Sequence, residues 1–191
     1  MFIFKKKYYL FLENTRSFNL DLVKTRYKLV IIYRNEDSKE SIAQIKNYAK
    51  LCRRKGIKFF IANNALMLTK VKADGLYISA HNKDLSLIRY KYLSYEIIGS
   101  AHNQKEIVIK LKQGCQKILV SRLFQTSYVS KKGFLGIIKF NTIAKRTPVE
   151  IIPLGGININ NLSKLKMVKS NSIAFLSAIK KKPAKFINRL F

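Results

Sequence analysis

The chain has few acidic residues. In 191 residues, 38 lysines and arginines stand against 10 aspartates and glutamates, which gives a formal net charge of +28. This excess indicates either a polyanionic partner such as nucleic acid or an anionic membrane surface, or a positive field that attracts phosphorylated metabolites. An AT-rich genome would explain the many Lys, Ile, Asn, Tyr and Phe residues, but not the scarcity of Glu. No nucleic-acid reader motif accompanies the charge, so nucleic-acid binding is the more distant alternative.

Cysteine and histidine are also scarce. The only cysteines are Cys52 and Cys115, without CxxC spacing, and there are only two histidines. This pattern predicts neither a zinc site nor a disulfide framework, and reduced thiols are typical of the cytosol. We therefore expect a cytoplasmic protein.

Long hydrophobic runs are missing, and the longest ones are far too short to cross a bilayer. The run at residues 8–12 meets Glu13 without a small-residue cleavage site, which argues against a signal peptide. Hydrophobic residues nevertheless make up 48% of the chain, and no long segment is of low complexity. The chain should therefore fold, and its length predicts a single domain over residues 1–191.

Short apolar runs alternate with helical spacings along the whole chain. The predicted strands cover residues 8–12, 29–33, 57–61, 75–78, 95–99, 117–120, 149–154 and 172–175. Helical segments are predicted between them, including a helix capped by Ser38 and short helices at 84–90 and 161–168. Such alternation predicts a parallel sheet, and eight repeats favour a compact closed (β/α)₈ TIM-type barrel. An open doubly wound sheet is the alternative, but no GxGxxG follows the first strand.

In a barrel of this type the active site lies at the carboxyl ends of the strands. Polar or small residues that follow the predicted strands are Arg34, Asn63, Asn64, Ser79, His81, Ser100, His102, Ser121, Thr126, Ser127, Gly155, Gly156, Ser177 and Ala178. His102 stands where a strand gives way to a helix, and its imidazole could act as a general acid or base near neutral pH. For His81, a packing or surface role is the alternative.

The pair Gly155 and Gly156 ends the seventh predicted strand. Adjacent glycines let backbone N–H groups approach an anion, although such a pair on its own is more often a turn. Ser177 and Ala178 stand at the corresponding place after the eighth strand. Phosphate-binding barrels hold the anion against these two loops, so the two segments together predict a phosphate site.

These segments together resemble the thiamine phosphate synthase/TenI family over most of the chain. The matching pieces, in family order, are Tyr33-Arg34, residues 73–78 (ADGLYI), residues 97–102 (IIGSAH) leading to Glu106, residues 124–126 (FQT), Leu135-Gly136, residues 148–157 (PVEIIPLGGI) and residues 177–179 (SAI). The resemblance implies a (β/α)₈ barrel of thiamine biosynthesis that binds phosphorylated small molecules, can form a homo-oligomer and has no membrane partner.

The resemblance also implies roles for particular residues. The synthases join a thiazole phosphate to hydroxymethylpyrimidine diphosphate, with Mg²⁺, and release pyrophosphate. By position, Gly155, Gly156, Ser177 and Ala178 would hold the thiazole phosphate. Arg34 and Thr126 would face the pyrimidine diphosphate, and Arg34 and His102 are the candidate catalytic residues. Further candidates for substrate or phosphate binding are Ser127, Asn63 and Lys131, and Asp84 is the candidate metal ligand.

The chain departs from the synthase pattern at several of these positions. The synthases carry Gln-Leu-Arg-x-Lys where residues 32–36 read IYRNE, so the Gln and Lys are missing. Asn63 replaces a metal-binding Asp, and losing a carboxylate weakens any site for Mg²⁺. Two alternatives therefore stand beside the synthase. The first is a TenI-like thiazole tautomerase in which His102 moves a proton, and the second is a thiazole-phosphate-binding protein without catalysis.

Overall fold

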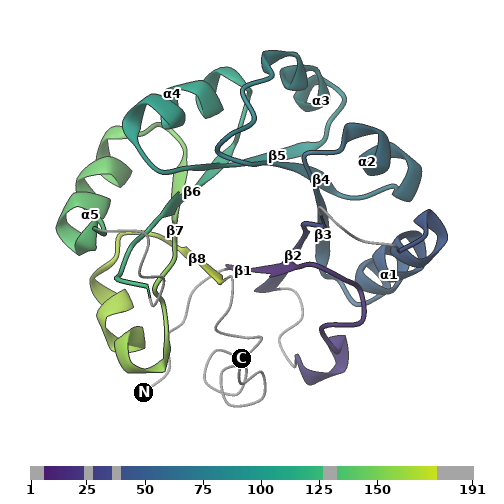
Figure 1. Ribbon diagram of the computed structural model, residues 1–191, viewed down its shortest axis with the longest axis horizontal. Coiled ribbons are helices and arrows are strands. Elements are labelled where there is room, and N and C mark those ends of the chain that lie inside the picture. Colours follow the sequence, from purple (N-terminus) through teal and green to yellow (C-terminus); the bar gives the residue numbers. More distant parts are fainter. Residues whose placement is uncertain (1–6, 24–27, 36–39, 127–132, 176–191) are drawn as a thin grey trace.

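Eight parallel strands form a closed ring with helices on its outside in the computed structural model (Figure 1). The structure describes residues 7–23, 28–35, 40–126 and 133–175. The strands are β1 (Lys7–Leu12), β2 (Leu29–Tyr33), β3 (Lys58–Ala62), β4 (Gly75–Ile78), β5 (Glu96–Ala101), β6 (Lys117–Ser121), β7 (Glu150–Leu154) and β8 (Ser172–Phe175). The helices are η1 (Leu20–Leu22), α1 (Ile42–Arg54), α2 (Ala65–Val71), η3 (Leu85–Ile88), α3 (Arg89–Tyr92), α4 (Gln104–Lys112), α5 (Gly136–Arg146) and η4 (Ile159–Met167), where η marks a 3₁₀ helix.

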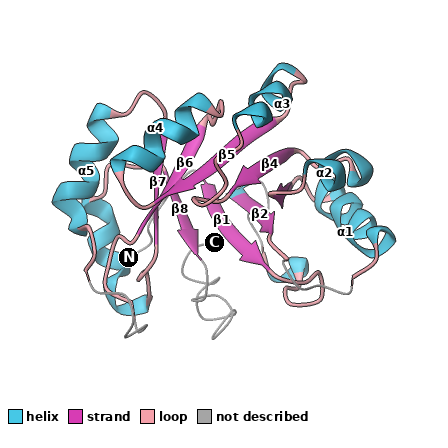
Figure 2. Ribbon diagram, turned by 45° about the horizontal axis from the view of Figure 1, so that its top comes forward, coloured by secondary structure: helices cyan, strands magenta, loops and turns pink. Residues whose placement is uncertain are grey.

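The ring closes because β1 pairs in parallel with both β2 and β8. The predicted (β/α)₈ barrel is therefore confirmed, and the open sheet is excluded. Figure 2 shows α1, α2, α4 and α5 on the outer surface of the sheet. Within the described ranges, no helix is long and apolar enough to span a bilayer.

Alternate residues of the strands build two separate layers of core. One set fills the barrel interior and includes Phe11 and Tyr77, whose rings meet edge to face with centroids 5.2 Å apart. The other set points outward and packs under the helices. Because both faces of each strand are buried, the strands read as continuous apolar runs in the sequence.

Some helix boundaries differ from the prediction. Helix α1 is capped by Ser41, whose hydroxyl accepts from the backbone of Gln44 while the Gln44 side chain accepts from the Ser41 N–H. The predicted cap, Ser38, lies outside the described residues. The predicted helix at 161–168 is the 3₁₀ helix η4, which begins earlier because Asn158 and Asn161 form a reciprocal cap there.

Charged residues gather at the amino ends of the strands, opposite the predicted active site. Glu96 of β5 accepts hydrogen bonds of 2.5 Å from both Lys58 of β3 and Lys117 of β6. Burial alone would raise the pKa of Glu96, but the hydrogen bonds from Lys117 and Lys58 outweigh it and lower that pKa. The carboxylate therefore joins three strands of the barrel floor in its ionised form.

Replacing Glu96 with Gln should lower the free energy of unfolding at pH 7 by about 1–3 kcal/mol, because two charge-assisted hydrogen bonds are weakened. The folded-state pKa of Glu96 lies below its unfolded value, so this contribution is complete above about pH 4.3 and is lost as the pH falls further. Denaturant unfolding at pH 7 and at pH 3 measures the change. The exposed ion-pair variant Asp21→Asn is the control, and a wild-type advantage that stays constant down to pH 3 would contradict the prediction.

Candidate active site at the carboxyl ends of the strands

His102 lies in the short connection between β5 and α4, held by a carboxylate from the first turn of the helix. Glu106 Oε2 accepts from the backbone N–H of His102 at 2.7 Å and lies 3.0 Å from its Nδ1. Glu106 Oε1 accepts from Asn103, the N-cap of α4. A carboxylate can only accept, so Nδ1 is the donor in this contact, and in the neutral imidazole Nε2 is then an acceptor. The imidazole is thus oriented for proton transfer through Nε2.

Ionisation of Glu106 supports this arrangement. Burial opposes the charge, but hydrogen bonds from the backbone and ring of His102 and from Asn103 outweigh it and lower the pKa of Glu106. The His102 side chain is 46% exposed. The imidazole is therefore accessible to a ligand while its other nitrogen is anchored.

The second histidine lies close to the first. His81 is carried by the loop after β4, and its ring centroid is 6.0 Å from that of His102, with the ring planes 31° apart. Both histidines of the chain therefore meet at one mouth of the barrel, although they are 21 positions apart in the sequence. This placement favours a site role for His81 over an isolated surface position.

Asn63 follows β3 in the left-handed conformation, with φ 55°. Its backbone N–H donates to Tyr77 O at 2.8 Å, and its side-chain Oδ1 accepts from the Ser79 N–H at 2.9 Å. Asn tolerates this conformation better than most residues. The side chain thus links the ends of β3 and β4, and its oxygen already has a backbone partner.

The side chains described here fit Mg²⁺ poorly. This ion prefers hard, anionic oxygens in octahedral geometry. Asn63 offers no charge, and the Asp84 side chain accepts from the Ser86 N–H as the cap of η3. Among the described residues, no three His, Cys, Asp or Glu side chains come together as a possible metal site. Asp84 as a metal ligand therefore stays a prediction.

Arg34 follows β2 at the same end of the barrel and is half-buried. Its backbone N–H donates to Leu12 O at 2.8 Å, and its positive charge acts on the Tyr77 hydroxyl. That hydroxyl is buried in the barrel interior and donates to Ser100 Oγ at 2.8 Å. Burial raises the pKa of Tyr77, against the opposing effects of Ser100 and Arg34. Arg34 thus supplies a cation above the inner core.

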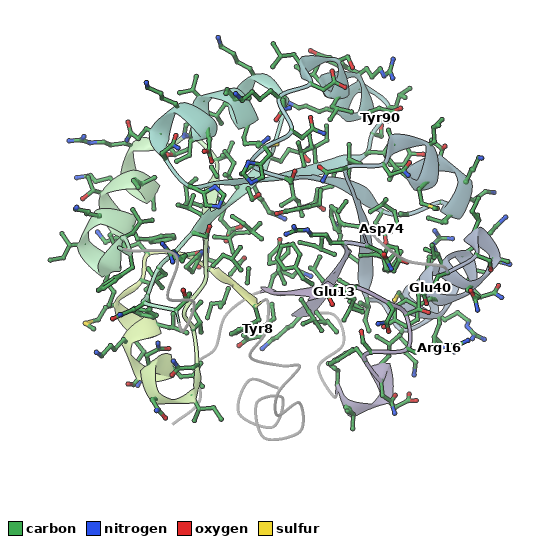
Figure 3. All side chains as sticks on the ribbon, in the orientation of Figure 1. Tyr8, Glu13, Arg16, Glu40, Asp74 and Tyr90 are labelled. Carbon is green, nitrogen blue, oxygen red and sulfur yellow. The ribbon has the colours of Figure 1, made fainter. Side chains whose placement is uncertain are left out.

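The carboxylate of Glu40 connects the loop after β1 with the end of β2, next to Arg34. Glu40 accepts from the backbone and hydroxyl of Thr15, which follows β1, and from the Tyr33 hydroxyl at 2.8 Å. Figure 3 labels Glu40 and Arg16, whose charge also acts on the carboxylate, in this region. Burial opposes ionisation of Glu40, but the hydrogen bonds from Thr15 and Tyr33 outweigh it and lower its pKa. Glu40 therefore ties the loop after β1 to the carboxyl end of β2.

Gly155 and Gly156 turn the chain from β7 into η4, and both have positive φ, 88° and 72°. A Cβ on Gly155 would lie 3.1 Å from Arg122 Cγ, and one on Gly156 would lie 2.2 Å from Phe124 O. The Asn161 side chain donates to Gly156 O at 2.7 Å. The pair is therefore a turn into which the loop after β6 packs closely, with an arginine beside it.

Arg122 is a site residue that the sequence reasoning missed. It follows β6, its stem lies against Gly155, and its guanidinium donates to Thr126 Oγ1 at 3.3 Å. Thr126 is half-buried, so the structure brings Thr126, Arg122 and Gly155 together. The available signal was a cation two residues after the predicted strand at 117–120. Ser127, Lys131, Ser177 and Ala178 lie outside the described residues, and their site roles stay predictions.

Comparisons with known proteins agree on one family. A family model described as thiamine monophosphate synthase matches residues 10–179. A thiamine-phosphate synthase from Clostridium perfringens is 27% identical over 199 residues, which cover 97% of this chain and 96% of that protein. One from Prochlorococcus marinus is 30% identical over 78% of this chain, which spans only 44% of that protein. The solved thiamine phosphate pyrophosphorylase of Pyrococcus furiosus shares the fold, with a TM-score of 0.71, 17% identity and 96% coverage of each chain.

Proposed function

The chain belongs to the thiamine monophosphate synthase family, and from that premise we propose that it binds a thiazole phosphate and condenses it with hydroxymethylpyrimidine diphosphate. The products are thiamine phosphate and pyrophosphate. The observation that carries the proposal is the turn at Gly155 and Gly156, with positive φ at both residues and Arg122 packed beside it. A glycine turn at the end of a barrel strand lets backbone and a cation approach a phosphate group.

The leaving diphosphate carries negative charge that the site must stabilise. Because the described side chains suit Mg²⁺ poorly, we assign the stabilisation of this charge to arginines. Arg34 and Arg122 both follow strands at this end of the barrel and are half-buried, where a cation interacts more strongly with an anion than it does in bulk water. Their planar guanidinium groups can each donate two parallel hydrogen bonds to phosphate oxygens. We assign Arg34 to the diphosphate, and Arg122, which lies beside the glycine turn, to the boundary between the diphosphate and the thiazole phosphate.

The test uses the purified full chain with both substrates. We expect thiamine phosphate to form, measured by chromatography after oxidation to the fluorescent thiochrome. Because the arginines take over charge stabilisation, adding EDTA should lower the rate by less than tenfold. Heat-treated protein and each single substrate are the controls. If no thiamine phosphate forms at any Mg²⁺ concentration, the proposal fails.

A second candidate is favoured by the environment of His102. The Glu106 carboxylate fixes Nδ1 and leaves Nε2 open, which is the arrangement of a general base whose partner orients it. A thiazole tautomerase requires only proton transfer and no diphosphate site. The two candidates share the thiazole phosphate and differ in whether a pyrimidine diphosphate is consumed.

A further inference from the structure

Helix α4 and its C-cap bury two polar side chains that the proposed reaction does not use. Lys110 and Gln113 are both fully buried. The aliphatic part of Lys110 passes over Gly99 of β5, where an added Cβ would come within 2.8 Å of Lys110 Cδ. The glycine therefore makes room for a lysine beneath the helix.

The polar ends of these two side chains meet the loop at residues 79–84. Lys110 Nζ donates to Asn82 O at 2.6 Å and to Gln113 Oε1 at 2.8 Å. Gln113 Nε2 donates to Asn82 O at 3.1 Å and to Asp84 O at 2.9 Å. Two side chains at one end of α4 thus hold two carbonyl groups of a neighbouring loop.

The same loop is fixed at its start by Asn63, which accepts from the Ser79 N–H. Between these two attachments the loop carries His81, whose ring faces that of His102. His102 precedes α4, and Lys110 and Gln113 lie at the other end of the same helix. One rigid element therefore sets the positions of both rings.

We propose that Lys110 and Gln113 are positioning residues that bind the loop at 79–84 to α4 and so hold His81 opposite His102 at the mouth of the barrel. The proposal rests on the proposed function only in placing the active site at this mouth.

The chemistry of the pair supports a positioning role. A buried lysine is unfavourable, and burial lowers the pKa of Lys110 to about 8. An apolar residue of the same size at position 110 would avoid this desolvation but could donate neither to Asn82 O nor to Gln113 Oε1. Each of these two oxygens would then lose a hydrogen bond. A donor pair at this place thus fixes the geometry of the loop, at the cost of desolvating a lysine.

The structural test needs no enzymatic activity. Lys110→Met keeps the stem and removes the donor, and Lys112→Met, at an exposed position of the same helix, is the matched control. In Lys110→Met we expect amide hydrogen exchange in residues 79–84 to rise at least tenfold, while exchange in α1 is unchanged. Because the chain has only two histidines, their ring signals are readily resolved by NMR, and the contact between the two rings should be lost.

A second variant covers the case in which Lys110→Met does not fold. Gln113→Glu keeps an acceptor for Lys110 but removes both donations to the loop carbonyls, so it should raise the exchange of residues 79–84 by the same order. Where turnover is measurable, kcat should fall about tenfold with KM within twofold of wild type. Loop exchange within twofold of wild type, with the ring contact retained in the folded variants, would overturn the proposal. If the wild-type chain forms no thiamine phosphate while loop exchange rises in the variants, the positioning proposal stands and the proposed function fails.

Discussion

Gly156→Ala should reduce the affinity for thiazole phosphate at least a hundredfold and lower the free energy of unfolding by more than about 2 kcal/mol. The new Cβ would lie 2.2 Å from Phe124 O and 2.6 Å from Gln125 O, which are backbone atoms that cannot rotate away. The loop after β6 must therefore move, and Arg122 and Thr126 move with it. Isothermal titration with thiazole phosphate and denaturant unfolding measure the two effects.

Two other glycines separate the causes of this effect. Gly56 follows α1 with φ 68°, and a Cβ there would meet nothing within 4 Å. Gly56→Ala should therefore cost only the left-handed strain, about 1–2 kcal/mol, and leave affinity unchanged. Gly155→Ala meets mainly the Arg122 side chain, so its effect should lie between the two. If the Gly156 and Gly56 variants bound thiazole phosphate with equal affinity, Gly155 and Gly156 would form a turn without a role in phosphate binding.

The fold could be predicted because its signals are local. Each strand is buried on both faces and reads as an apolar run, and each run is followed by a helical spacing. The pairing of β1 with β8 closes the barrel, and this closure was predicted from the presence of eight strand–helix repeats. Helix starts were less predictable, because a serine at 38 and one at 41 look alike until the side chain of Gln44 reaches back to Ser41.

The candidate site was predictable only in outline. The carboxyl ends of the strands could be identified from the sequence, but contacts between loops could not. Asn63 resembles a weakened metal ligand in the sequence, whereas in the structure its oxygen accepts from Ser79. Arg122 and Lys110 also escaped prediction. Their roles depend on glycines at 155 and 99, which lie on neighbouring elements and make room for the longer side chains.

His102→Ala should lower the thiazole tautomerase rate by about 10²–10⁴ while leaving the affinity for thiazole phosphate within about twofold of wild type, because only the proton-transferring group is removed. Glu106→Gln keeps a side chain of the same size but loses the carboxylate that fixes Nδ1, so its rate should fall by a smaller factor. The rate is followed by the ultraviolet absorbance change as the thiazole ring becomes aromatic.

The control for this effect is His81→Ala, which removes the facing ring and leaves the His102–Glu106 contact in place. If His102 is the proton-transferring group, the loss in His102→Ala must exceed the loss in His81→Ala. A tautomerase rate that is unchanged in His102→Ala would exclude the tautomerase mechanism and leave the condensation as the reaction to account for.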